Sequence, residues 1–186
     1  MSNECLKIKP PLDGDCISSL KAGQKLLISG VAYVARDLAH QRMVESIRNG
    51  DPLPFDPAGQ VIYYAGPTPA RPGNPVGSIG PTTSYRMDSF VEELLKTGLR
   101  AMIGKGVRAP EIKGLLASYG AVYLVATGGA GALLASRIVE SEVIAYEDLG
   151  PEALRRVVFN DFPVYVAYDA AGGDMFEQAQ RVWQLS

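Results

Sequence analysis

Cysteine and histidine are scarce in this sequence of 186 residues, which contains two cysteines, Cys5 and Cys16, and one histidine. No Cys-x-x-Cys pair occurs, so the chain lacks the ligand spacing of a zinc site. Two cysteines are also too few for a four-iron cluster, which usually takes three or four thiolates. We therefore interpret Cys5 and Cys16 as free thiols and expect no metal ligands in this chain.

Strong charge of one sign and long apolar runs are also missing. The formal net charge is −2, which does not suggest a protein that binds nucleic acid. No apolar run approaches the roughly 20 residues that cross a bilayer, and the opening Met-Ser-Asn-Glu-Cys-Leu-Lys has no apolar core of a secretion signal. We expect a cytoplasmic protein with neither a membrane nor a nucleic acid as partner.

Phosphate-binding fingerprints are absent as well. The segment Thr127-Gly-Gly-Ala-Gly-Ala132 follows an apolar run, but it lacks the Gly-x-Gly-x-x-Gly spacing and has no Walker lysine. Close packing between a helix and a strand is the favoured reason for its small residues, and a turn whose exposed N–H groups bind an oxygen ligand remains open. A nucleotide-binding enzyme that works alone is therefore disfavoured.

What the chain does contain is an alternation of strand and helix signals over a length that suits one domain, residues 1–186. Short apolar runs bounded by turn residues predict strands, at 6–9, 25–30, 61–65, 99–103, 121–126, 142–146, 156–159 and 164–168. Helices or helical turns are predicted at 15–20, 36–49, 110–119, 133–138 and 151–155, with a last one ending near 183. The fold class is therefore α/β, with 31–35 as a crossing segment and 160–163 as a turn.

The clearest helix follows the segment 77–86. Apolar residues recur there at steps of three and four and form one stripe, namely Met87, Phe90, Val91, Leu94 and Leu95, with Gly98 as the stop signal. Thr82, Thr83 and Ser84 occupy positions where a helix cap belongs. Arg86 lies in the first turn, where a cation opposes the helix dipole unless an anion lies between them. An ordinary cap with a solvated Arg86 is the alternative.

Two further places offer cations. Arg36 and His40 are four residues apart at the start of a predicted helix and could hold a carboxylate. Alternatively, Arg36 pairs with Asp37 or another nearby acid, and His40 is a structural hydrogen-bonding residue, which we favour for His40. Lys105 follows a predicted strand between two glycines, at a strand end where ligands bind in α/β proteins, although a solvated lysine is the common case. The long loop 66–80, rich in proline and glycine, suits a rim or lid.

Four motifs carry a resemblance to a known family. They are Gly80-Pro-Thr-Thr-Ser-Tyr-Arg-Met-Asp-Ser-Phe90, Ala35-Arg-Asp-Leu-Ala-His-Gln-Arg42, Tyr64-Ala-Gly-Pro67 and Ile103-Gly-Lys-Gly106. Together they resemble the iron–sulfur-dependent class I fumarase and tartrate dehydratase family, specifically its β subunit or C-terminal domain. The similarity covers nearly the whole chain, and the second motif is closer to the fumarase version.

The resemblance implies a swivelling β/β/α domain of three layers and a hydro-lyase that adds water to fumarate to give L-malate. It implies that Thr82 is catalytic, that Arg36, Arg86 and Lys105 bind the dicarboxylate substrate, and that His40, Thr83 and Gly80 support the site. It further implies a [4Fe-4S] cluster on a partner α subunit, in an α2β2 assembly, and no cofactor on this chain alone.

Two alternatives stay open. The chain could be the β subunit of an L-tartrate dehydratase, which shares the loop at 80–90 and the Gly-Lys-Gly segment. In a different class, it could be a non-catalytic module that binds a carboxylate or phosphate with the same cationic loop.

Overall fold

Residues 5–184 are described by a computed structural model, in which the central feature is a parallel sheet. Its strands are β1 (Leu6–Ile8), β2 (Lys25–Val34), β3 (Val61–Tyr63), β4 (Ala101–Gly104) and β5 (Val122–Val125), paired in that order. Because all five run in the same direction, their carboxyl ends lie along one edge of the sheet.

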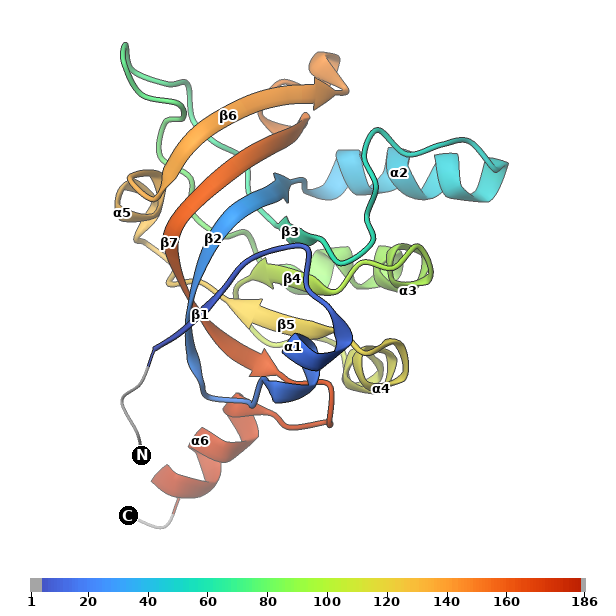
Figure 1. Ribbon diagram of the computed structural model, residues 1–186, viewed down its shortest axis with the longest axis vertical. Coiled ribbons are helices and arrows are strands. Elements are labelled where there is room, and N and C mark those ends of the chain that lie inside the picture. The colour runs from blue at the N-terminus through green and yellow to red at the C-terminus, as the bar shows by residue number, and fades with distance from the viewer. Residues whose placement is uncertain (1–4, 185–186) are drawn as a thin grey trace.

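A long strand, β7 (Leu154–Tyr168), joins both sides of this sheet. It runs antiparallel to β2 along most of its length, to β5 near its end, and to β6 (Ile138–Ala145) at its start. Strands β2 to β5 and β7 therefore form a closed ring of paired strands. Figure 1 shows β2, β7 and β6 curving side by side as an antiparallel layer.

Three helices, α2 (Asp37–Asn49), α3 (Asp88–Lys96) and α4 (Pro110–Tyr119), cover the outer face of the parallel sheet (Figure 1). Shorter elements complete the chain: α1 (Gly14–Ser19), α5 (Gly131–Ala135), α6 (Met175–Trp183) and the 3₁₀ turns η1 (Ser84–Met87) and η2 (Glu147–Glu152). Across residues 5–184, none of the helices combines the length and the apolarity that crossing a membrane requires.

Alternating side chains of the parallel strands enter two separate cores. Val61 and Tyr63 of β3 pack between the two β layers, whereas Ile62 and the following Tyr64 pack against the helices. Strands buried on both faces carry continuous apolar runs, and this one does. The predicted α/β class and its three layers, β/β/α, are confirmed.

Local signals placed several helix ends correctly. The helix α2 ends at Gly50, whose φ of 78° is the left-handed conformation that glycine adopts readily. The helix α4 begins at Pro110 and ends before Gly120, as predicted. The stripe predicted for α3 faces the core, with Met87, Val91, Leu94 and Leu95 all buried.

The predicted crossing segment at 31–35 and the predicted turn at 160–163 are both wrong. The strand β2 continues to Val34 and β7 runs through Pro163, because the two strands pair with each other on both sides of a bulge. At the bulge Gly30 and Asp161 have positive φ, and the Asp161 N–H donates to the Ser29 hydroxyl at 2.9 Å. The irregular residues therefore bend the strand pair without ending it.

Two helix predictions near the antiparallel layer are also displaced. The helix predicted at 133–138 is α5, which ends at Ala135, and Ile138 already begins β6. The turn predicted at 151–155 is η2, which ends at Glu152, while the next residues pair with β6 as part of β7. In both cases the pairing of β6 with β7 overrides the local helical preference.

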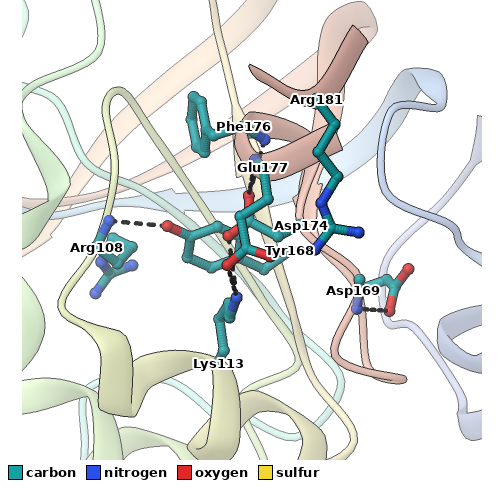
Figure 2. Close-up of polar contacts among 9 residues, drawn as sticks. Arg108, Lys113, Tyr168, Asp169, Asp174, Phe176, Glu177 and Arg181 are labelled. Carbon is teal, nitrogen blue, oxygen red and sulfur yellow. Dashed lines mark hydrogen bonds and ion pairs between the residues drawn. The ribbon is translucent and has the colours of Figure 1, made fainter. Parts of the chain in front are cut away.

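The last helix, α6, is fixed at its start by Asp174. This carboxylate accepts hydrogen bonds from the N–H groups of Phe176, at 2.8 Å, and Glu177, at 3.1 Å. The Lys113 ammonium of α4 lies 3.2 Å from the same carboxylate and also contacts Glu177 (Figure 2). A nearly buried cap and an ion pair therefore attach α6 to α4.

We expect Asp174→Ala to lower the free energy of unfolding by about 1–2 kcal/mol, because it removes a helix cap together with the ion pair to Lys113. The matched control is Glu177→Ala, which removes a half-exposed partner of the same lysine. Its expected effect is within about 0.5 kcal/mol. Urea unfolding of both variants measures the difference, and equal losses would contradict the role of the cap.

Candidate functional site

The candidate site lies at the edge where the parallel strands end. The segment 81–84 crosses this edge and is fixed there by backbone hydrogen bonds. The Thr82 N–H donates to the Tyr64 carbonyl, just after β3, at 2.7 Å, and the Lys105 N–H, just after β4, donates to the Thr82 carbonyl at 3.2 Å. The Ser84 N–H donates to the Lys105 carbonyl at 3.0 Å, which completes a parallel bridge between Thr83 and Lys105.

Arg86 turns back toward the same edge from η1. Its Nη2 donates to the Thr82 hydroxyl oxygen at 2.8 Å and to Asp37 Oδ2, also at 2.8 Å. The Arg86 side chain is 37% exposed, so part of its guanidinium still faces solvent. Arg86 is therefore not simply solvated, because it pairs with an anion of the chain itself, the Asp37 carboxylate of α2.

Arg36 lies on the other side of Asp37. Its Nε is 3.2 Å from Asp37 Oδ2, and its Nη2 is 3.2 Å from Glu152 Oε1. The other Glu152 oxygen accepts the Leu38 N–H at 3.0 Å, at the start of α2. Arg36 therefore pairs with nearby acids, and the single Asp37 carboxylate links the two arginines at the site.

Lys105 completes the group of cations. The residue is exposed, and its ammonium has no hydrogen-bond or ion-pair partner within the described part of the chain. Its side chain lies along Gly128, where an added Cβ would come within 3.6 Å of the Lys105 Cδ. Thr82, Thr83, Arg86, Arg36 and Lys105 are thus brought to one edge of the sheet.

Gly80 lies at a close backbone contact beside this group. The Ile79 N–H donates to the Gly131 carbonyl at 3.1 Å, and a Cβ at Gly131 would lie only 3.0 Å from the Gly80 nitrogen. The small residues at 127–132 therefore allow the loop 78–80 to approach α5. This loop contact, rather than the close helix–strand packing expected, is the reason we find for the glycine at 131.

His40 is placed beneath the site and not in it. The side chain is fully buried, its Nδ1 lies 3.0 Å from the Arg36 carbonyl oxygen, and its ring meets the Tyr64 ring edge-on. Burial lowers the His40 pKa to about 4. The backbone hydrogen bond to Arg36 opposes this shift, and the nearby positive charge of Arg108 adds to it. His40 is therefore neutral at pH 7 and contacts Arg36 only through the backbone.

The predicted cap at 82–84 is wrong. Thr83 precedes η1, but its side chain makes no capping hydrogen bond, and α3 itself begins only at Asp88. The Ser84 hydroxyl turns away from the helix and accepts the Lys105 N–H at 3.1 Å. The bridge to Lys105 holds this segment extended, so its side chains cannot reach the first turn of α3.

Sequence reasoning missed a buried ion pair behind the site. The Arg108 side chain is completely buried, with its Nε 2.5 Å from Asp88 Oδ1, and Asp88 also accepts the Ala109 N–H at 2.8 Å. The Arg108 guanidinium lies over the rings of Tyr64 and Tyr123. No local motif marks Arg108, because its partner is 20 positions away on another helix.

The cations lie on an open face. Two hollows on the described surface border the loop 66–80, and neither is lined by Thr82 or by any of the three cations. An exposed apolar side chain lies within two positions of each cation in sequence, namely Leu38 at 46%, Tyr85 at 62% and Val107 at 59% exposure. An open group of cations with an apolar rim is incomplete as an enzyme site, because no residue between 5 and 184 encloses it and excludes water.

The described residues do not fit an iron–sulfur cluster. Within residues 5–184, no three side chains of the Cys, His, Asp or Glu type come together as a metal-binding group. Cys5 and Cys16 are not joined by a disulfide, and burial, followed by the charge of Asp13, raises the pKa of the Cys16 thiol.

Comparison with known proteins places the chain in one family. Residues 4–179 match the family model described as Fumarase C-terminus. The chain is 37% identical over 166 residues to "Fumarate hydratase class I, aerobic" of Escherichia coli strain K12, a match that covers 88% of this chain and 30% of that protein. The chain therefore spans about 30% of the length of the fumarate hydratases of this type.

Two other relatives are similar to the chain over most of their own length. The "Putative L(+)-tartrate dehydratase subunit beta" of Methanocaldococcus jannaschii is 37% identical over 171 residues, which cover 89% of this chain and 88% of that protein. The "L(+)-tartrate dehydratase subunit beta" of Escherichia coli strain K12 is 29% identical over 178 residues, which cover 93% and 87%.

The low pKa of His40 leads to a pH dependence of stability. The unfolded chain takes up a proton at this histidine near pH 6.5, whereas the folded chain does so only near pH 4. Stability from this group is therefore complete above about pH 6.5 and falls as the pH drops toward 4, by about 3 kcal/mol in all. Urea unfolding at several pH values between 7.5 and 4 measures the loss.

His40→Gln is the control, since it removes the only histidine of the chain and leaves every carboxylate in place. The variant should lose less stability than the wild type over the same pH range. Identical pH profiles would show that His40 does not stay neutral in the folded state.

Proposed function

Because the chain belongs to the Fumarase C-terminus family, we propose that it is the β subunit of a two-subunit [4Fe-4S] hydro-lyase that interconverts fumarate and L-malate. One observation supports this most directly: Arg36, Arg86, Lys105 and the Thr82 hydroxyl meet at the carboxyl edge of the parallel sheet. We propose that residues 1–186 act as one domain, in the cytoplasm, in an α2β2 assembly.

The charges at this edge suit a dicarboxylate shared with a partner. Three cations face two acids, Asp37 and Glu152, so the group retains one positive charge. Each guanidinium has five N–H donors, and the contacts to Asp37 and Glu152 use only some of them. Arg86 and Lys105 can therefore hold one substrate carboxylate while Asp37 keeps both arginines in place. The second carboxylate needs donors from the α subunit.

Thr82 is the residue we assign to the proton transfer at carbon. Arg86 donates to the Thr82 oxygen, so the hydroxyl proton points elsewhere and a negative charge on that oxygen would be stabilised. In dehydration, the Thr82 oxygen, once deprotonated, accepts the proton of the carbon next to a carboxylate, and in hydration it returns that proton. A free threonine hydroxyl is a very weak base at pH 7, so its deprotonation requires an acid–base partner from the α subunit.

We assign the cluster to the α subunit, because residues 5–184 offer no set of ligands for it. The exposed apolar rim beside each cation agrees with an edge that a second polypeptide covers. On this basis the isolated chain is inactive as a hydro-lyase, and activity requires both subunits.

L-tartrate dehydration is the second candidate. It is favoured by the match of this chain to nearly the whole length of two relatives named as tartrate dehydratase β subunits. Against it, the motif at 35–42 is closer to the fumarase version. Both reactions remove water from a hydroxydicarboxylate, so both require the same cations.

The experiment is an anaerobic purification of the tagged chain from its own host, followed by identification of partners and iron. We expect a partner with about four irons per pair, in line with one cluster. Fumarate, L-malate, tartrate and a methylated analogue then identify the substrate. A chain that purifies alone and iron-free under these conditions, yet binds malate or phosphate tightly, would favour a non-catalytic module.

Thr82→Ala in the two-subunit enzyme should lower kcat by about 100-fold or more, because the proton-transferring oxygen is removed. Folding should change little, since the backbone bonds of this residue remain. The matched control is Thr97→Ala, which removes a hydroxyl bonded to the Leu94 carbonyl at the end of α3. Steady-state kinetics and thermal unfolding check both, and near-wild-type turnover of Thr82→Ala would contradict the assignment.

A further inference from the structure

We propose that Tyr123 and Ser84 are positioning residues that hold Lys105 in place for the substrate. This inference rests on the proposed function, in which Lys105 binds a substrate carboxylate. Both side chains are fully buried. The sequence analysis considered Ser84 only as a helix cap and gave Tyr123 no role.

The need for such residues follows from the surroundings of Lys105. Its ammonium has no partner within residues 5–184, and its side chain is exposed. A lysine side chain has four rotatable carbons and much conformational freedom, so no contact of its own locates the charge. Its location depends on where the backbone at 104–106 is fixed.

The hydroxyls of Ser84 and Tyr123 fix that backbone on both sides. The Lys105 N–H is shared between the Ser84 hydroxyl oxygen, at 3.1 Å, and the Thr82 carbonyl, at 3.2 Å. The Ser84 oxygen also lies 2.9 Å from the Tyr123 hydroxyl oxygen. The Tyr123 hydroxyl lies 2.8 Å from the Gly106 carbonyl oxygen, to which it donates. A phenol has a single proton, so Ser84 gives its proton to the Tyr123 oxygen while it accepts from Lys105. The chain of bonds therefore joins the Lys105 amide to the Gly106 carbonyl.

The glycines beside Lys105 fit this arrangement. A Cβ at Gly104 would lie 1.9 Å from the Ser84 oxygen, so the hydroxyl occupies the space that any other residue would fill. Gly106 has a φ of +81°, a conformation that suits glycine. The Gly-Lys-Gly sequence is thus explained by the position of Ser84 on one side and by a backbone turn on the other.

Tyr123 itself is held firmly. It lies on β5 within the core, its ring is 4.9 Å from the Arg108 guanidinium carbon above it, and the Tyr168 ring centre is 5.4 Å away. Burial raises the pKa of the Tyr123 phenol, so the hydroxyl keeps its proton at neutral pH. A fixed donor of constant protonation is suited to positioning and not to acid–base chemistry.

The test compares Tyr123→Phe and Ser84→Ala in the two-subunit enzyme. Each variant removes a hydroxyl that restrains the backbone beside Lys105, while the backbone bridge to Thr83 remains. We expect KM for the dicarboxylate to rise about 10-fold with a smaller change in kcat, since a shift of about 1 Å at a site can cost up to 100-fold. The matched control is Tyr168→Phe, whose hydroxyl accepts the Arg108 N–H at 3.1 Å (Figure 2) and should leave KM unchanged.

A second comparison separates positioning from a loss of stability. In a Lys105→Gln background, adding Tyr123→Phe should raise KM no further, because both changes act through the same side chain. A further rise in that background, or a wild-type KM for Tyr123→Phe, would overturn the proposal.

Amide hydrogen exchange of the full chain gives a readout that does not depend on activity. The Lys105 amide keeps its bond to the Thr82 carbonyl, so it should exchange about 3-fold faster in Tyr123→Phe and in Ser84→Ala, and at the wild-type rate in Tyr168→Phe. If the wild-type complex has no hydro-lyase activity, the proposed function is wrong, and exchange at Lys105 still decides whether these two residues hold it. Unchanged exchange in both variants would refute their role.

Discussion

Lys105 is held by its backbone and not by its side chain. The bridge to Thr83 fixes the end of β4 against the segment 81–84, and the same segment brings the Thr82 oxygen to Arg86. Because peptide groups make the bridge, the position of the Lys105 backbone does not depend on the charge state of any side chain, whereas Asp37 is needed to place the two arginines. The backbone therefore places one of the three cations, and ion pairs place the other two.

The repulsion between those cations is reduced by acids placed among them. Asp37 contacts both Arg36 and Arg86, and Glu152 contacts Arg36 from η2. Beneath them, His40 stays neutral because burial and the nearby Arg108 charge disfavour its protonated form. A protonated histidine there would add a positive charge in a place that water cannot reach, and this would lower the stability of the folded chain.

Much of this arrangement could be predicted from the sequence where the signal is local. The apolar stripe of α3 and the left-handed Gly50 depend on neighbours within a few positions, and both predictions are confirmed. The predicted position of Lys105 directly after a strand is also confirmed, since β4 ends at Gly104.

What could not be predicted depends on contacts between distant segments. The sequence Asn160-Asp-Phe-Pro163 has the composition of a turn, yet it continues as a strand because β2 pairs with it. Ser84 is a residue type that often caps helices, yet its hydroxyl accepts the N–H of Lys105, 21 positions away. Asp37 was recognised only as a neighbour of Arg36, since its contact with Arg86 needs the packing of two helix starts. Local propensity carries no information about such partners.

The double pairing of β7 has a consequence for how the protein is made. The strand β7 lies near the end of the chain and pairs with β2, near its beginning, and with β5. A growing chain therefore cannot close the ring until β7 has been synthesised, and until then β2 and β5 expose edges that could pair with other chains. Pairings between distant segments also slow folding. Newly made copies thus pass through a stage in which the strands that carry the site residues are formed but still open on two sides.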